Sequence, residues 1–368
     1  MKILLKAAIA ALNLIFACLK LLPVQNKIVY LSRQADEKSE DMQLLEEAVG
    51  EFTGGRTRQV FLCKTLSGNL LHKAGYCLHI FRQMYHLATA RVAVLDSYCI
   101  AVSVLRQRRS LAVIQMWHAL GALKKFGYSI VDKKEGSSSR LAAAMKMHQN
   151  YTCILASSKA SAPHFAEAFG YPAEAVRVMS LPRVDRLTDQ SYISSTREKI
   201  YQFYSQARGK SLVVYAPTFR RGRDISRQIE ELAAQFGDEY FFVLKKHPLM
   251  KAEKLTCFSD EHFTTIEMLT AADHVICDYS AVIFEAAVMR KPLYFYTFDY
   301  DQYRAGRDFY IDYMAEMPGP ISADAAKLAD AVKQGLADPA RVDAFARRYV
   351  ENQEHCSRRL AEMIAALL

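Results

Sequence analysis

The stretch LVVYAPTFRRGRDISRQIEELAAQFGDEYFFVLK, residues 212–245, contains a complete strand–helix–strand pattern. It begins and ends with short, continuous apolar runs, 212–217 and 240–245, which are typical of buried strands. Between them, residues 224–237 repeat their apolar positions with a period of 3.6, which is typical of an amphipathic helix. Strands that are apolar throughout and joined by a helix predict parallel pairing in a sheet that is covered on both faces.

The same alternation continues on both sides of this stretch, in two series. Further strands are expected at 27–31, 59–63, 92–95, 112–116, 153–156 and 175–179 in the first series, and at 274–277 and 292–296 in the second. Helical patterns lie between them, and the chain is helical and amphipathic from about residue 323. The sequence therefore predicts the α/β class, with two Rossmann-like, doubly wound domains facing a central cleft. We expect the first domain at 23–208 and the second, with closing C-terminal helices, at 209–368.

Composition narrows the classes of protein and of partner. The 368 residues are 51% hydrophobic and 24% charged, which excludes a disordered chain. The net charge of +9 favours a polyanionic or membrane-surface partner. Basic residues are spread along the chain without a DNA- or RNA-binding motif, so no nucleic acid partner is expected. The eight cysteines have no metal-ligand spacing, which predicts reduced, mostly buried thiols and no metal site.

Residues 1–22, MKILLKAAIAALNLIFACLKLL, form an apolar segment of their own. Only thirteen residues separate Lys6 from Lys20, and they include Asn13, whereas a membrane crossing needs about 20 apolar residues. A signal peptide is disfavoured because the segment runs directly into the strand expected at 27–31. The lysines that flank the apolar residues fit a helix lying on an anionic membrane surface, and a buried N-terminal helix is the alternative. We therefore expect a peripheral protein on the cytoplasmic face of the cell membrane.

Polar residues that follow the predicted strands are the candidates for chemistry, because ligands of doubly wound sheets bind beyond the carboxyl ends of the strands. These residues are His118 after 112–116, Arg220 and Arg221 after 212–217, Lys246 and His247 after 240–245, and Asp278 and Ser280 after 274–277. Three of the four groups are cationic or contain histidine. The pattern predicts a site for a phosphorylated ligand.

Within the second series, each candidate has a plain alternative. Ser280 can cap the next helix, whose N-terminus attracts phosphate, or it can be an ordinary cap. Glu285 can reach a ribose from that helix or be a solvated helix residue. Arg220 and Arg221 can bind phosphate oxygens or form a solvated basic loop. His247, fixed before a proline, can donate to a phosphate or be structural.

His118 is the candidate general base, because an imidazole with a pKa near 6.5 can accept a proton from an alcohol. Lys124 and Lys125 follow in the same turn and are expected to hold an anionic substrate. A histidine with a structural role is the alternative.

Six stretches together resemble the CDP-glycerol glycerophosphotransferase family, whose members prime or polymerise teichoic acids and related capsular polymers. In order, they are WHALGALKKFG (117–127), LPRVD (181–185), YAPTFR (215–220), KKHP (245–248), DYSAVIFEAAVMRKP (278–292) and DFYIDYMAEMPGP (308–320). The resemblance extends from about residue 27 to 345. The chain departs from the family pattern at Ser180 and Leu181, where a glycine is more frequent ahead of the motif, at Ala281 instead of a second serine, and at Glu285 instead of aspartate.

The resemblance implies a GT-B architecture and the roles of the site residues. His118 would deprotonate the acceptor, His247 and Arg220 would bind the donor pyrophosphate, and Ser280 would hold phosphate. Asp278 and Glu285 would lie at the nucleotide pocket. The acceptor hydroxyl would attack the β-phosphate of CDP-glycerol or a related CDP-alditol and release CMP, without a cofactor or metal.

The implied acceptor is a polyprenyl-linked saccharide or poly(alditol phosphate) chain. Lys124 and Lys125 would attract its phosphate, and Gly121 would let it approach closely. Two other classes remain open from the residues: a GT-B glycosyltransferase that uses a nucleotide sugar, and a binding module without activity.

Overall fold

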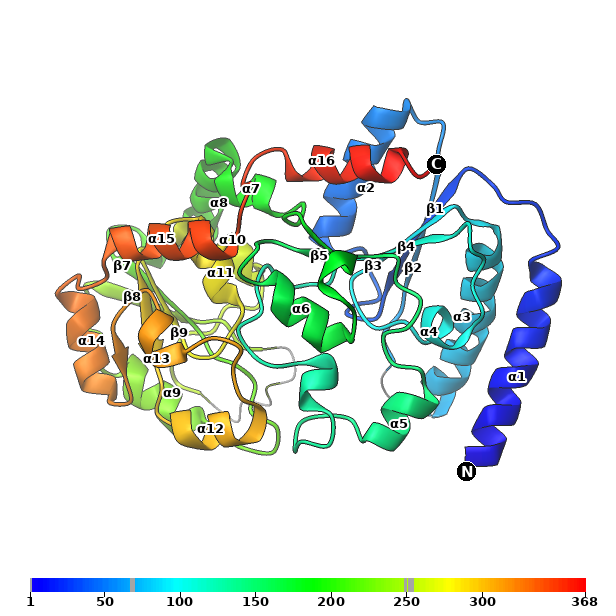
Figure 1. Ribbon diagram of the computed structural model, residues 1–368. Helices are drawn as coiled ribbons and strands as arrows, with labels where there is room; N and C mark the ends of the chain where they lie inside the picture. Colours follow the sequence, from blue (N-terminus) through cyan, green and yellow to red (C-terminus); the bar gives the residue numbers. More distant parts are fainter. Residues whose placement is uncertain (1, 67–69, 248–249, 251–254) are drawn as a thin grey trace. The chain divides into compact units, whose positions relative to one another are not determined.

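The computed structural model describes residues 2–66, 70–247, 250 and 255–368, and the chain divides into two compact units (Figure 1). The first unit comprises Met1–Ala119, Phe126–Arg183 and His355–Leu368. The second comprises Leu120–Lys125 and Val184–Glu354. The chain therefore passes from the first unit to the second twice, after Ala119 and after Arg183.

This division differs from the predicted domain boundary at 208/209. Residues from 184 onward belong to the second unit because α8 (Gln190–Phe203) packs against α10 (Thr265–Ala271). The last helix, α16 (Cys356–Ala365), belongs to the first unit because it packs against α2 (Glu40–Thr53). Packing between helices that are distant in sequence determines both differences, and hydropathy does not reveal such packing.

The first unit contains a six-stranded sheet in which every pairing is parallel, in the order β2-β1-β3-β4-β5-β6. The strands are β1 (Lys27–Ser32), β2 (Arg58–Cys63), β3 (Val92–Leu95), β4 (Ala112–Gln115), β5 (Cys153–Ala156) and β6 (Val176–Val178). Besides α2 and α16, its helices and 3-10 turns are α1 (Lys2–Leu19), α3 (Leu70–Thr89), α4 (Ile100–Val104), η1 (Gly127–Ile130), α5 (Ser139–Ala144), α6 (Ala162–Phe169) and η2 (Ala173–Ala175). β1 and β3 are buried along their whole length, as their continuous apolar sequences predict.

The second unit contains a five-stranded parallel sheet in the order β11-β10-β9-β7-β8. The strands are β7 (Ser211–Ala216), β8 (Tyr240–Leu244), β9 (His274–Cys277), β10 (Leu293–Tyr296) and the short β11 (Ile321–Ser322). Besides α8 and α10, its helices and turn are α7 (Val184–Thr188), η3 (Ser205–Ala207), α9 (Ser226–Ala233), α11 (Val282–Val288), α12 (Tyr300–Arg307), α13 (Tyr313–Glu316), α14 (Ala325–Lys333) and α15 (Pro339–Tyr349). The α/β class with parallel sheets is confirmed.

Helix α1 lies beside α3 (Figure 1) and also contacts α5. Phe16 is fully buried, and the Asn13 side chain donates to the carbonyl of Val104 (3.1 Å) and accepts from the amide of Arg106 (2.8 Å). Large apolar residues on the same helix remain exposed, Leu4 by 75% and Leu14 by 70%. Among the helices of the described residues, none combines the length and apolar character needed to cross a membrane.

The strand orders fix where a ligand is expected in each unit. In the first sheet the order reverses between β1 and β3, and in the second between β7 and β9. Loops diverge at such a switch point and leave a crevice beyond the carboxyl ends of the strands. A ligand is therefore expected beside the loops that follow β3 and β9.

Candidate active site

In the first unit, His118 follows a strained turn at the end of β4. Trp117 has a φ of 62°, in the left-handed region that non-glycine residues seldom adopt. Its backbone amide donates to the Gln115 side-chain oxygen (3.0 Å), and its ring stacks on Phe126 with centroids 5.1 Å apart. These contacts hold the unusual conformation and set the direction in which His118 leaves the sheet.

The hydrogen bonds of the imidazole define its tautomer. His118 Nδ1 lies 2.8 Å from the backbone oxygen of Asp96, the first residue after β3. A carbonyl oxygen only accepts, so Nδ1 carries the proton and Nε2 keeps a lone pair. The amide nitrogen of Gln34 lies 3.3 Å from Nδ1, but it is also a donor, so in this tautomer the contact is not a hydrogen bond. This is the state that a general base requires.

The surroundings of His118 also keep it neutral. Burial lowers its pKa to about 4, with Arg183 acting in the same direction, while the Asp96 carbonyl and the Asp41 carboxylate act against the shift. At neutral pH the ring is therefore unprotonated. It can accept a proton as soon as an alcohol begins to attack.

Asp96, which was not among the predicted site residues, lies at the switch point of the first sheet. Its side chain is 2% exposed, and neither carboxylate oxygen receives a well-formed hydrogen bond from the described residues. Burial raises its pKa to about 6, and the nearby hydroxyls of Ser32 and Ser97 counteract part of that rise. The signal was present, because Asp96 directly follows a predicted strand as His118 does.

In the second unit, Arg220 is the centre of a buried ionic cluster with Asp278 and Asp299. Its Nη1 lies 2.6 Å from Asp278 Oδ2, and its Nε and Nη2 reach the two Asp299 oxygens at 3.1 and 3.0 Å. A further bond from Nη1 to the Thr218 carbonyl (2.6 Å) commits most of the five N–H donors to protein acceptors. Although burial acts against it, the two aspartates raise the pKa of Arg220.

This cluster changes the interpretation of two predicted residues. Arg220 is 7% exposed, so the solvated-loop alternative is excluded, and its guanidinium is turned to carboxylates rather than left open to a phosphate. Asp278 is fully buried and accepts from the backbone amide of Thr218 at 2.9 and 3.0 Å. Through its bonds to Asp278 and Asp299, Arg220 joins the loops that follow β7, β9 and β10. Arg221, next along the chain, is exposed.

Residues at the start of α11 follow the prediction only in part. The helix begins at Val282 after Ala281, one residue later than expected, although Ser280 Oγ still accepts from the amide of Val282 at 3.4 Å. Glu285 is 4% exposed, which excludes the solvated-helix alternative. Its charge helps to raise the pKa of the neighbouring Cys277 thiol, after burial and Asp278.

The loop after β8 places His247 beside Phe219, with ring centroids 5.6 Å apart and nearly parallel. Partial desolvation and the nearby Lys124 lower the pKa of His247 and so favour its neutral form. Lys246 is paired with Glu261 at 2.6 Å. Of the two residues predicted to bind an anion in this loop, His247 is the exposed one, and it lies beside an aromatic ring.

The segment Leu120–Lys125 belongs to the second unit, although His118 belongs to the first. Lys124 forms a β-bridge with Phe309, and Lys125 is paired with Asp308 at 2.8 Å. A Cβ added to Gly121 would lie 2.5 Å from the Phe284 ring. Packing against Phe284 therefore favours a glycine at this position, and its role in acceptor approach stays a prediction.

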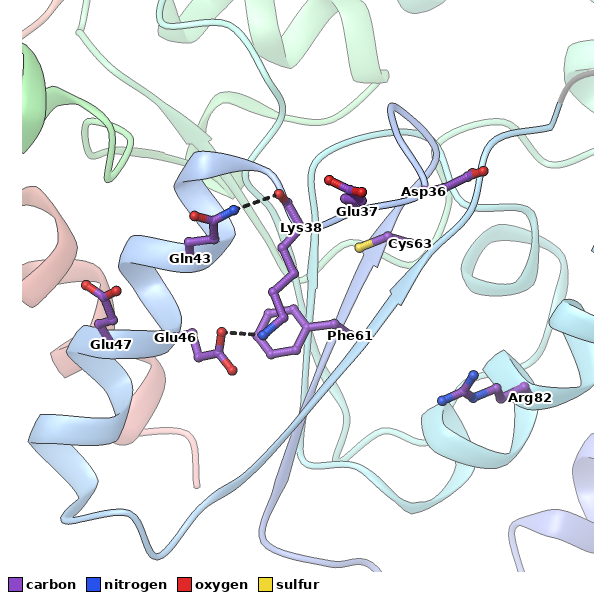
Figure 2. Close-up of a pocket in the computed structure, with 9 residues that line it drawn as sticks. All are labelled: Asp36, Glu37, Lys38, Gln43, Glu46, Glu47, Phe61, Cys63 and Arg82. Carbon is purple, nitrogen blue, oxygen red and sulfur yellow. Dashed lines mark hydrogen bonds and ion pairs between the residues drawn. The ribbon is translucent and has the colours of Figure 1, made fainter. Parts of the chain in front are cut away.

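Each unit has an open pocket among the described residues. The first, of about 650 Å³, lies by α2 and the end of β2 (Figure 2) and is lined by Asp36, Glu37, Lys38, Gln43, Glu46, Glu47, Phe61, Cys63 and Arg82. Figure 2 shows Lys38 reaching over the Phe61 ring to Glu46, at 2.5 Å. Its four acids outnumber its two bases, so it is unsuited to phosphate. The second, of about 490 Å³, contains Asp299 and Arg223 and lies at the ends of β10 and β11.

No group of three or more His, Cys, Asp or Glu side chains in the described part of the chain is arranged to hold a metal ion. The arrangement offers two chemistries in two places. The first unit presents the neutral imidazole of His118 beyond the carboxyl end of β4. The second presents His247, Lys124 and Arg221 near a rigid ionic cluster, a set suited to an anion.

The model of the family described as CDP-glycerol:poly(glycerophosphate) glycerophosphotransferase matches residues 14–366. The teichoic acid ribitol-phosphate primase of Bacillus spizizenii is 34% identical over 95% of this chain and 93% of its own length. The teichoic acid glycerol-phosphate primase of Bacillus subtilis is 29% identical over 70% of this chain and 68% of its own length.

Among solved structures, the wall teichoic acid polymerase TagF has a similar fold. It superposes with a TM-score of 0.76 at 20% identity, covering 99% of this chain and 97% of the TagF chain. At that identity the likeness concerns the fold alone. The similarity in fold agrees with the two parallel sheets described above.

Proposed function

The chain belongs to the CDP-glycerol:poly(glycerophosphate) glycerophosphotransferase family, and we propose that it transfers an alditol phosphate from a CDP-alditol to a hydroxyl of a polyprenyl-linked teichoic acid acceptor. The family match covers nearly the whole chain, and the primases similar to it act in teichoic acid synthesis. The nucleotide-sugar glycosyltransferase alternative has no such support. The GT-B arrangement of two Rossmann-like units about a cleft is part of this proposal.

Ribitol phosphate is the alditol phosphate that we favour. Identity to the ribitol-phosphate primase is 34% over 95% of the chain, against 29% over 70% for the glycerol-phosphate primase of Bacillus subtilis. The ribitol-phosphate primase is also matched over 93% of its length. We therefore propose CDP-ribitol as the donor.

The observation that carries the proposed chemistry is the fixed tautomer of His118, with Nδ1–H on the Asp96 carbonyl and Nε2 open. In the proposed step, the acceptor hydroxyl oxygen bonds to the β-phosphorus of the donor and its proton passes to Nε2 of His118. The bond from that phosphorus to the bridging oxygen breaks, and CMP leaves. Catalysis then rests on positioning and on cationic stabilisation of the phosphates.

We assign the donor to the second unit. The cationic or hydrogen-bonding groups proposed for its phosphates are His247, Arg221 and Lys124, with Ser280 at the start of α11.

Two buried residues, Arg220 and Asp278, are proposed to act indirectly, by fixing the loops that carry these groups. Glu285, a buried carboxylate on α11, stays a candidate for the nucleotide pocket.

Membrane attachment through the first unit completes the proposal. Helix α3, which packs against α1, also has exposed apolar residues, Leu78 (73% exposed) and Phe81. Lysines at both ends of α1 suit an anionic headgroup layer. This apolar face would hold the enzyme on the cytoplasmic side of the membrane, where a polyprenyl-linked acceptor is anchored.

Nucleotide-dependent thermal stabilisation tests the donor class. CDP-ribitol and CMP at about 100 times their Kd should stabilise the folded protein by about 2.7 kcal/mol and raise the melting temperature. UDP-sugars at equal concentration serve as the control. Stabilisation by UDP-sugars alone would contradict the proposal and favour a glycosyltransferase.

A further inference from the structure

We propose that Arg183 and Asp41 form a buried ion pair that positions the proposed base, His118, by holding its backbone carbonyl. Arg183 lies in the LPRVD stretch, to which the resemblance assigns no role. The inference rests on the proposed function of His118. It adds two positioning residues, which would act through His118.

The pair itself is made of several bonds that involve both side chain and backbone. The Arg183 backbone amide donates to Asp41 Oδ1 at 2.8 Å, and its Nε and Nη2 donate to Oδ2 at 2.9 and 2.5 Å. The side chain of Asp41 is 2% exposed and that of Arg183 is 14% exposed. A forked guanidinium on a buried carboxylate has little freedom to rotate.

The same guanidinium reaches the residue that carries the base. Arg183 Nη2 donates to the backbone oxygen of His118 at 3.2 Å. The ring of His118 is held on its other side by the Asp96 carbonyl at 2.8 Å. Backbone and ring are thus each fixed by one bond, directly after the left-handed turn at Trp117, where the chain would otherwise relax.

The ion pair lies close to both points at which the chain leaves the first unit. His118 is followed by Ala119, the last residue before the chain passes to the second unit, and Arg183 is the last residue before it passes again. One guanidinium therefore joins the two places at which the chain leaves the first unit.

Two substitutions separate positioning from charge. Arg183→Lys keeps a cation that can pair with Asp41, but an ammonium lacks the planar fork that reaches both Asp41 and the His118 carbonyl. Asp41→Asn removes the anchor of the guanidinium and keeps the volume. Glu46→Gln is the matched control, because Glu46 lies on the same helix, α2, in an exposed pair with Lys38.

The first readout does not depend on activity. In protein labelled with 15N-histidine, the wild-type His118 ring should show a single Nδ1–H tautomer, assigned by its loss in His118→Ala. Arg183→Lys and Asp41→Asn should give a mixture of tautomers, and Glu46→Gln should match the wild type. If the ring signal is unchanged in both folded variants, the proposal is overturned.

The second readout is the split between kcat and KM. Misplacement of a base by about 1 Å lowers kcat about 100-fold, while the KM for CDP-ribitol should stay within about twofold. If Arg183→Lys and Asp41→Asn lower the melting temperature but leave the tautomer and kcat unchanged, the pair serves stability alone. The same conclusion follows if both variants unfold. Absence of turnover in the wild type, with the tautomer shift present, would contradict the proposed function but not the positioning role.

Discussion

Arg220 and Arg221 are adjacent on one loop, yet their surroundings give opposite predictions. Arg220→Ala would leave the fully buried Asp278 and the nearly buried Asp299 without their main cation. Breaking such a buried pair costs about 3–5 kcal/mol, so we expect loss of the folded second unit. Arg221→Ala, at an exposed residue, should leave the melting temperature within about 1 °C of the wild type, as surface substitutions do.

Donor titrations then separate a structural arginine from one that binds ligand. If Arg221 contacts a donor phosphate, its loss should raise the KM for the CDP-alditol about tenfold, as the loss of one charge-assisted hydrogen bond does. A stable, folded Arg220→Ala protein would refute the structural role assigned to Arg220. An unchanged KM for Arg221→Ala would remove Arg221 from the phosphate site.

At the scale of residues, the sequence predicts where polar groups gather but not what they contact. His118, Arg220, His247 and Asp278 all lie beyond strand ends, as the strand pattern required. The pattern does not tell an arginine turned to solvent from one buried between two aspartates. That distinction depends on Asp299, which follows a different strand and becomes a neighbour only when the sheet is formed.

The segment Leu120–Lys125 is an element whose packing can be tested through one glycine. In Gly121→Ala, the new Cβ would lie 2.5 Å from the Phe284 ring, which is buried and stacked on Phe345. Overpacking of this kind costs about 1–3 kcal/mol, and we expect a lower melting temperature. Gly50→Ala on α2 is the control, because nothing lies within 4 Å of its Cβ position and alanine favours the helix. Equal melting temperatures for Gly121→Ala and the wild type would contradict this packing.

Helix α1 yields a second prediction at this scale, because its two faces differ. Leu14→Glu, on the exposed face, should weaken binding to vesicles that contain anionic lipid and leave the melting temperature unchanged. Phe16→Ala, on the buried face, should lower stability by about 3–5 kcal/mol. Vesicle co-sedimentation and thermal melting measure the two effects. Undiminished vesicle binding by Leu14→Glu would argue for another attachment surface.

Over the whole molecule, buried histidines predict how the first unit responds to pH. Burial lowers the pKa of His86 and His118 to about 4 and that of His148 to about 3. In the unfolded chain these rings titrate near about 6.5, so below that pH the unfolded state binds more protons and stability falls. Asp96, with its pKa raised to about 6, acts in the opposite direction as a single group. Stability of the first unit should therefore decrease between about pH 6.5 and pH 5.

Melting temperature as a function of pH checks this expectation. His148→Gln should flatten the dependence between about pH 6.5 and pH 5, because one proton fewer is taken up on unfolding. The slope, and not the absolute stability of the variant, is the quantity to compare. A pH-independent wild-type melting temperature over this interval would contradict the histidine account.

The fold as a whole could be predicted from hydropathy, whereas the division into units could not. Continuous apolar runs located the strands within a residue or two, and only the two-residue β11 gave no pattern. Residues 120–125 and the last helix belong to units other than those expected because side-chain packing decides their place. The pairing of Arg183 with Asp41, which lie 142 residues apart in sequence, is of the same kind.

The most direct test of the central claim is product formation on a lipid-linked teichoic acid acceptor. CDP-ribitol and CDP-glycerol would be supplied separately to the wild type and to His118→Ala, and CMP release and the mass of the acceptor would be followed together. We predict that CDP-ribitol gives CMP and adds one ribitol phosphate for each CMP. Loss of the base should lower the rate about 10²–10⁴-fold while donor binding persists. Absence of CMP with both donors, or a full rate in His118→Ala, would contradict the account.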